Sequence, residues 1–183
     1  MSRWVSIGIL RYSVEVNWLN GNHLVPISVY KWDNILFQGA TSTGVAFQEL
    51  EYRLSRKTFF NSPIPHKLPY IVFVSGSIPT DNWKEPFILL SENKWFISAQ
   101  RTSIAIGEQA PIELMRVFSS SENNLITINT PDGINSIAET LFADILNFHQ
   151  QFKPFSSYEE NPKIYEECLV DSLIEYYDLD EWE

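Results

Sequence analysis

The fold is decided by residues 69–83, whose sequence is PYIVFVSGSIPTDNW. Residues 70–74 form a continuous run of β-branched and aromatic side chains, which is typical of a strand buried on both faces at the centre of a parallel sheet. The chain then passes into a Pro-Thr-Asp-Asn sequence at 79–82, which predicts a loop that ends in a helix N-cap. Because ligands of open α/β sheets bind where a strand ends and its loop begins, the loop after residue 74 is the first candidate site.

The chain after this loop alternates between helical and strand patterns. Its apolar residues predict helices around 83–90, 94–99 and 111–118 and strands at 102–106 and 125–129. A final helix is indicated by apolar residues spaced three or four positions apart, namely Ile134, Ile137, Leu141, Ile145, Phe148 and Phe152. This order of elements predicts right-handed crossovers and an α/β fold with a mostly parallel sheet.

The chain before this strand predicts an antiparallel hairpin at the edge of the sheet. Residues 5–12 alternate as a strand that residues 14–19 continue, and Asn20-Gly21-Asn22 is typical of a hairpin turn. Residues 24–30 would then return along the first strand, and Pro26 places the returning strand at an edge.

The net charge of −10 is concentrated at the carboxyl end of the chain. Residues 158–183 carry ten acidic side chains and one basic one, so residues 1–157 are close to neutral. No basic cluster favours a nucleic-acid partner, and no apolar run of about 18 residues predicts a membrane span. A single cysteine, Cys168, excludes an internal disulfide and favours a reducing compartment, so we expect a cytoplasmic protein. We divide the chain into one domain, residues 1–157, and an acidic tail, residues 158–183.

The acidic tail has two interpretations. It is either a solvated terminus or an acidic amphipathic helix that packs on its own domain or docks on a partner. The second interpretation rests on apolar residues too numerous for solubilisation alone, and Cys168 on their face is expected to pack rather than react. The candidate partner-binding residues are Leu169, Leu173, Tyr176, Tyr177 and Trp182.

Two segments resemble von Willebrand factor A (VWA) domains of the bacterial tellurium-resistance and stress type. Those domains carry a strand followed by Thr-Asp-Gly-Glu-Pro-Thr-Asp-Asp-Trp, of which this chain keeps Pro79, Thr80, Asp81 and Trp83. Upstream, the turn Gly-Ala-Thr-Ser-Thr-Gly at 39–44 places Thr41 where the family has a metal-binding threonine, and it opens a helix with Phe47, Leu50 and Leu54 on one face. The resemblance covers roughly residues 4–152. It implies a Rossmann-like three-layer sandwich with an antiparallel edge hairpin.

The chain departs from the family at the metal site. The family binds Mg²⁺ through an Asp-x-Ser-x-Ser sequence, which is absent here, and through an aspartate at the position of Gly76. Mg²⁺ usually requires at least one carboxylate ligand, so we expect no metal and no cofactor. The remnant of the site would be Thr41, Ser75, Gly76, Ser77 and Asp81.

A second departure concerns the centre of the sheet. The resemblance begins at the family's second strand, so its first strand and first helix are missing, and two inner strand edges would lack partners. Three solutions are open. Either residues 5–10 pair directly with residues 70–74, or another chain donates a strand, or the native start lies upstream. The first solution predicts a hydrogen-bonded ladder between these two strands.

The sequence gives little support for an enzyme. Ser75-Gly76-Ser77 superficially resembles a nucleophile elbow, but a hydrolase also needs a base, and His23, His66 and His149 fall in a turn, a loop and a late helix. We therefore expect a non-catalytic protein-protein interaction module of degenerate VWA type. The resemblance implies a bacterial stress or defence complex, with an operon-encoded protein partner or self-association. The alternative is a Rossmann-like protein that binds a small ligand or nucleotide with the loop after residue 74.

Overall fold

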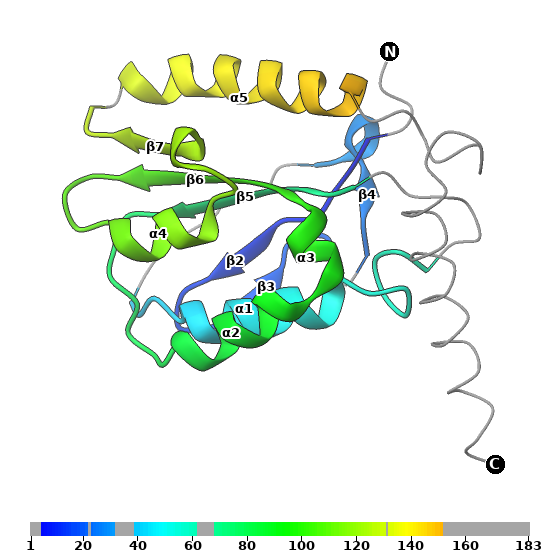
Figure 1. Ribbon diagram of the computed structural model, residues 1–183, viewed down its shortest axis with the longest axis horizontal. Coiled ribbons are helices and arrows are strands. Elements are labelled where there is room, and N and C mark those ends of the chain that lie inside the picture. The colour runs from blue at the N-terminus through cyan, green and yellow to red at the C-terminus, as the bar shows by residue number, and fades with distance from the viewer. Residues whose placement is uncertain (1–4, 22, 32–38, 62–67, 131, 152–183) are drawn as a thin grey trace.

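The parallel sheet predicted from the sequence is the centre of the fold. The computed structural model describes residues 5–21, 23–31, 39–61, 68–130 and 132–151. Its parallel sheet has three strands in the order β5 (Tyr70–Ser75), β6 (Gln100–Ile106) and β7 (Leu125–Ile128). The predicted α/β class is therefore confirmed, with a parallel sheet and a separate antiparallel hairpin (Figure 1).

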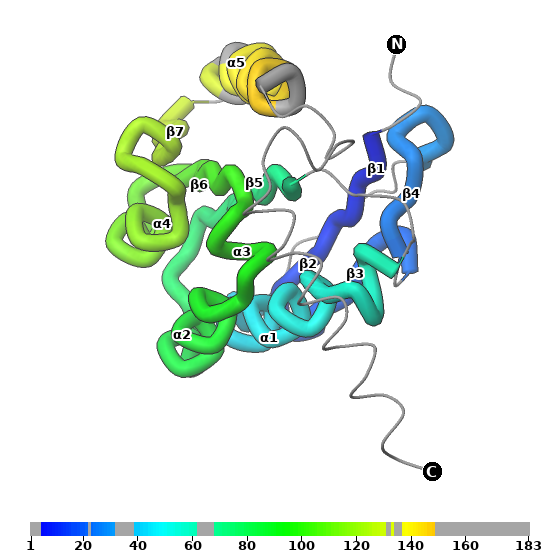
Figure 2. The backbone as a smooth tube through the Cα atoms, turned by 45° about the vertical axis from the view of Figure 1, so that its right-hand side comes forward, coloured from blue at the N-terminus to red at the C-terminus, as the bar shows by residue number. Residues whose placement is uncertain are grey.

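Helices lie on both sides of this sheet (Figure 2). One side is covered by α5 (Asp132–Gln151), where the ring of Phe148 lies 5.7 Å from that of Tyr70. The other side is covered by α4 (Ile112–Phe118) and by α1 (Thr43–Arg53), α2 (Lys84–Glu92) and α3 (Lys94–Ser98). All five helices were predicted at these places. A short 3-10 helix, η2 (Glu122–Asn124), precedes β7.

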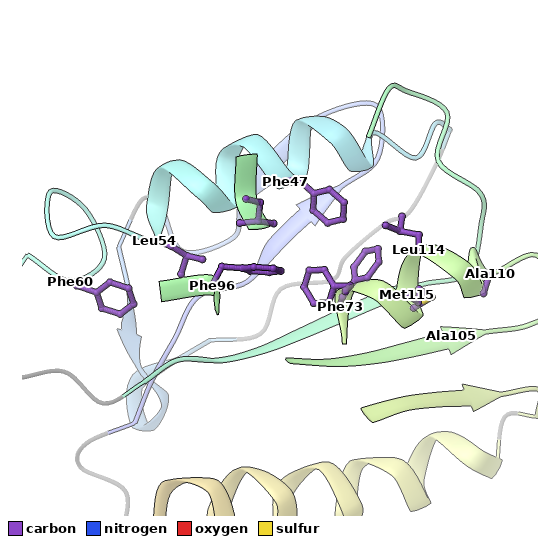
Figure 3. Close-up of a cluster of buried hydrophobic side chains, with 11 residues drawn as sticks. Phe47, Leu54, Phe60, Phe73, Phe96, Ala105, Ala110, Leu114 and Met115 are labelled. Atoms are coloured by element: carbon purple, nitrogen blue, oxygen red, sulfur yellow. The ribbon is translucent and has the colours of Figure 1, made fainter. Parts of the chain in front are cut away.

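The core between α1, α4 and the sheet is built from aromatic rings. Phe118 is 1% exposed, and its ring centroid lies 4.9 Å from that of Phe73 and 5.9 Å from that of Phe47. These rings therefore join α4, β5 and α1 into one cluster (Figure 3). Two serines also lie buried here, and their hydroxyls are satisfied because Ser103 donates to the Met115 carbonyl and Ser119 donates to Ser103.

The amino-terminal hairpin differs from its prediction. The chain reverses at Ser13–Glu15, where Ser13 N donates to Glu15 O at 3.0 Å, rather than at Asn20-Gly21. The strands β3 (Val16–Trp18) and β4 (Val25–Pro26) pair with β2 (Leu10–Tyr12) and β1 (Ser6–Ile7), respectively, and not with each other. The predicted continuation of the first strand through 14–19 is therefore wrong. So is the long returning strand at 24–30, because residues 27–29 form the 3-10 helix η1 (Ile27–Val29).

The edge position of Pro26 is confirmed. Ile27 N donates to Val5 O, so the backbone of residue 27 faces the partner strand and that of residue 26 faces outward. Proline lacks an N–H group, so Pro26 leaves no donor on this outer edge.

The junction between hairpin and parallel sheet corrects two further predictions. Within the described residues β5 pairs only with β6, so residues 5–10 do not form the expected ladder with 70–74. Instead, the phenol of Tyr12 reaches across and donates a 2.6 Å hydrogen bond to the Val74 carbonyl. Burial raises the pKa of Tyr12 to about 12, so the phenol stays protonated as a donor even at alkaline pH where an exposed tyrosine ionises. The strand β5 is also not buried on both faces, because Val74 is 43% exposed.

The acidic tail, residues 158–183, lies outside the described residues, and so do its five candidate partner-binding side chains.

Among the helices that are described, none has the length and apolar character needed to cross a bilayer.

Candidate functional site

The loop after β5 and the turn before α1 meet at the carboxyl end of the sheet. Thr41 Oγ1 and Ser77 Oγ lie 2.7 Å apart in a hydrogen bond. Thr41 N donates to Thr80 Oγ1 at 3.0 Å, and Thr80 N donates back to Thr41 O at 3.0 Å. Two segments 36 to 39 residues apart are thus joined by three hydrogen bonds. This contact brings together the predicted site residues Thr41 and Ser77, and it adds Thr80, which the site prediction did not include.

Asp81 binds the amino terminus of α1. Its Oδ1 accepts a hydrogen bond from Gly44 N at 3.0 Å, and its Oδ2 accepts one from Val45 N at 3.1 Å. The local N-cap residue, Ser42, makes no side-chain capping bond, so Asp81 takes over this role from a distant loop. A carboxylate at this end of a helix is also stabilised by the helix dipole.

The sequence predicts that the loop at 79–82 ends in the N-cap of the helix that follows it, α2. The structure shows that this prediction is wrong. The N-cap position of α2 is Trp83, which makes no side-chain capping bond, and Asn82 Oδ1 accepts only a 3.3 Å hydrogen bond from Lys84 N. The Asp81 carboxylate is used on α1, 36 to 37 residues earlier in the chain. No local sequence pattern signals a cap that is provided across such a separation.

Two glycines allow the close approach of these loops. A Cβ atom built on Gly44 would lie 2.2 Å from the carbonyl oxygen of Asn82, which is far inside van der Waals contact. A Cβ atom on Gly76 would lie 3.1 Å from the carbonyl oxygen of Ile106. The hydroxyl of Ser75, the residue before Gly76, donates to Ser77 O at 3.1 Å. All five predicted site residues therefore lie in or beside one compact loop junction, which we call the carboxyl-end cluster: Thr41, Gly44, Ser75, Gly76, Ser77, Thr80 and Asp81.

The polar groups of the carboxyl-end cluster bind the loop after β5 to the start of α1. Its one carboxylate, Asp81, has both oxygens occupied by backbone N–H groups. Its hydroxyls bond to each other or to backbone groups. Over the described ranges, no group of three or more His, Cys, Asp and Glu side chains is placed to hold a metal ion.

Of the three histidines of the chain, only His23 has a side chain that the structure describes. His23 is exposed in the turn between β3 and β4, on the hairpin rather than beside Ser75. His66 and the side chain of His149 lie outside the described residues. The described geometry therefore places no imidazole beside the Ser75-Gly76-Ser77 hydroxyls.

Neither a known protein-family profile nor a curated protein sequence matches the chain. The relation to VWA domains accordingly stays a proposal.

Replacing Asp81 with alanine is expected to lower the free energy of unfolding by about 1–3 kcal/mol, because two backbone donors of α1 lose their acceptor. Urea unfolding followed by circular dichroism measures this difference. Glu108→Ala is a matched control, since Glu108 is an exposed acidic residue in the loop after β6. Equal stability of the two variants would show that Asp81 does not cap α1 in solution.

Proposed function

We propose that this chain is a non-catalytic protein-interaction module of degenerate VWA type, with a Rossmann-like three-layer arrangement, that works in a cytoplasmic bacterial stress or defence complex. The observation that carries the proposal is that the Asp81 carboxylate and the hydroxyls of the carboxyl-end cluster bond to groups of the two loops themselves. In open α/β sheets that bind a ligand, the ligand lies beyond the carboxyl ends of the strands, where polar groups can contact it. Here Thr41, Thr80 and Asp81 hold two loops together instead.

The same geometry disfavours the alternative of a nucleotide or small anionic ligand. Phosphate groups bind at helix amino termini through free backbone N–H groups. The N–H groups of Gly44 and Val45 at the start of α1 already bond to Asp81. An anion would have to displace this carboxylate, and the two negative charges would repel each other.

Protein binding is supported by apolar side chains on the outer faces of the helices. Ile88 and Leu89 on α2 are 58% and 59% exposed, and Ile97 on α3 is 58% exposed. A contiguous exposed apolar patch is typical of protein contact surfaces, and these three side chains are the candidates for one. The partner would be an operon-encoded protein or a second copy of the chain, and the acidic tail would contribute to this association.

We predict that the carboxyl-end cluster binds no Mg²⁺ or Mn²⁺. Water-proton relaxation during a Mn²⁺ titration should reveal no site tighter than about millimolar, because no free carboxylate is presented. Thr41→Ala is the diagnostic variant. A tighter site in the unaltered chain that Thr41→Ala abolishes would contradict this prediction and the proposed function with it.

We also predict that residues 158–183 act in association and not in folding. A chain ending at residue 157 should unfold in one cooperative transition, because α1, α4, β5 and β6 share one hydrophobic core. We expect a partner protein to co-purify with the full chain in an amount comparable to that of the chain itself. The same partner should not co-purify with the truncated chain. An unfolded truncation would place the tail in the core, and a full chain that purifies alone as a monomer would remove the support for an interaction module.

A further inference from the structure

The amino-terminal hairpin has two faces, and one of them packs against α1. The ring of Tyr12 lies 6.0 Å from that of Phe73 in the aromatic core. On the neighbouring strand, Trp18 Nε1 donates to Glu49 Oε1 of α1 at 2.8 Å. Successive side chains of a strand point to opposite faces, so Arg11, the residue before Tyr12, points away from α1.

Arg11 lacks a partner on that opposite face. It is half-buried, and its Nε atom is fully buried without a hydrogen-bond acceptor. Within the described part of the chain, no carboxylate forms an ion pair with it. Asn17 lies directly across from Arg11, and the acid next to it in the strand register, Glu15, accepts a 3.3 Å hydrogen bond from Asn17 instead. Because a partly buried charge without a partner is costly, a carboxylate brought to Arg11 would be stabilised there.

The side chains beside Arg11 on this face are apolar. A Cβ atom on Gly8 would lie 3.2 Å from the Trp18 ring, on the α1 side, so its neighbours Ile7 and Ile9 point the other way. Both isoleucines are only partly buried. In Figure 2, α5 lies along the parallel sheet and the hairpin extends beyond it. We call Ile7, Ile9 and Arg11 the hairpin outer face.

The acidic tail follows α5 and can reach this face. The Phe148 ring lies 5.7 Å from that of Tyr70, the first residue of β5, so α5 ends at the amino end of the parallel sheet. Figure 1 shows this end of α5 at the same end of the molecule as β4, the strand that pairs with β1. Residues 152–183 can extend to about 100 Å, which exceeds the size of the domain. A tethered segment is also presented at an effective concentration of about millimolar, which favours it over an acidic segment of another protein.

The charge of the tail matches the hairpin outer face and not the neighbouring helix. Residues 158–183 carry ten acidic side chains and one basic one, with apolar residues such as Leu169 and Leu173 between them. Glu139 and Asp144 are exposed on α5, so this helix would repel an acidic segment. The hairpin outer face offers the cation and the apolar side chains that such a segment needs.

We propose that in the free chain the acidic tail folds back on its own domain, packs apolar side chains on Ile7 and Ile9, and places a carboxylate against the guanidinium of Arg11. The contact lies outside the aromatic core, so a chain that ends at residue 157 is still expected to fold. The inference goes beyond the proposed function because it gives the tail a binding site within the chain. A partner that binds the tail has to displace it from this site.

The only cysteine of the chain, Cys168, lies in the tail and allows a direct test with the full chain. A nitroxide is attached to Cys168 of the ¹⁵N-labelled chain, which is purified free of any partner. The amide signals are compared before and after chemical reduction of the nitroxide. We expect the nitroxide to broaden the signals of Ile7, Ile9 and Arg11 much more strongly than those of α4, which lies on the other side of the sheet.

Substitutions of Arg11 test the charge pairing. Arg11→Gln should lower the intramolecular binding constant about tenfold or more, because a hydrogen bond between charged groups is lost, and the broadening should decrease accordingly. Arg11→Lys keeps the charge and should retain part of the broadening. Lys84→Gln is the matched control, since it removes an exposed positive charge from α2 and should leave the broadening unchanged. Broadening that survives Arg11→Gln in full would overturn the proposal.

A mixing experiment separates the tail of the same chain from that of a second copy. The ¹⁵N-labelled chain without nitroxide is mixed with an equal amount of nitroxide-bearing chain at natural isotope abundance. Broadening of the hairpin signals in this mixture would assign the contact to a second copy and overturn the proposal.

A second label position guards against disturbance by the nitroxide itself. The nitroxide is moved to Ser172→Cys in a Cys168→Ser background, where the same hairpin signals should broaden. Absence of broadening from both positions would overturn the proposal. It would leave the proposed interaction function intact, whereas the absence of any co-purifying partner counts against that function alone.

Discussion

Replacing Phe118 with alanine is expected to lower the free energy of unfolding by about 3–5 kcal/mol, which is a large share of the stability of a typical domain. The side chain is 1% exposed and touches rings from four other elements. Its ring centroid lies 4.9 Å from that of Phe73, 5.3 Å from Phe96, 5.9 Å from Phe47 and 6.5 Å from Phe87. Its removal would leave a cavity between α1, α2, α3 and β5 that none of these elements can fill alone.

The control for this experiment is Phe142→Ala. Phe142 is 61% exposed on α5, so the same change of side chain should alter stability by about 0.5 kcal/mol or less. Urea unfolding of both variants, followed by far-ultraviolet circular dichroism, gives the comparison. Similar losses in the two variants would mean that the aromatic cluster is not the core of the folded protein in solution.

Replacing Gly44 with alanine is expected to destabilise the protein by about 2–3 kcal/mol, although the same change within a helix ordinarily stabilises it. The reason is steric. The new Cβ atom would lie 2.2 Å from the carbonyl oxygen of Asn82 and 3.1 Å from Oδ2 of Asp81. Relieving this overlap requires the 76–82 loop to move away, and that movement breaks the hydrogen bonds from Gly44 and Val45 to Asp81.

Gln48→Ala on the exposed face of the same helix controls for helix propensity. That variant should be neutral or slightly more stable, because alanine is the better helix former. The midpoints of thermal unfolding of the Gly44→Ala and Gln48→Ala variants, measured in the same buffer, give the comparison. A Gly44→Ala variant as stable as Gln48→Ala would refute the close contact between α1 and the 76–82 loop.

The parallel part of the fold could be predicted because its signals are local. The run at 70–74, the helical spacings from Ile134 to Phe148 and the intervening strands each follow from residues close in sequence. The hairpin could not be predicted correctly, since Asn20-Gly21 gives the strongest turn signal whereas the chain reverses at Ser13–Glu15, which contains no glycine, proline or asparagine. Gly21 does adopt a positive φ of 72°, but in a turn that carries the chain from β3 to β4 along one edge.

The candidate site could be predicted only in part, for a related reason. The resemblance to VWA domains pointed to Thr41, Ser75, Gly76, Ser77 and Asp81, and these residues do lie at one junction. The role of Asp81 as a cap of α1 could not be inferred, because its partners lie 36 and 37 residues away. Gly44 likewise looks like an ordinary member of a glycine-containing turn until its distance from Asn82 is known.

The Tyr12 bridge between the hairpin and the parallel sheet has a consequence for the order in which the chain folds. It joins residues 62 positions apart, whereas β5, β6 and β7 are connected in sequence by short crossovers through α2, α3 and α4. Closing a longer loop costs more chain entropy, and within the described residues no strand ladder joins the hairpin to the parallel sheet to offset that cost. We therefore expect the parallel sheet to assemble first and the hairpin to dock last, and the hairpin to be the first part of the native protein to come loose.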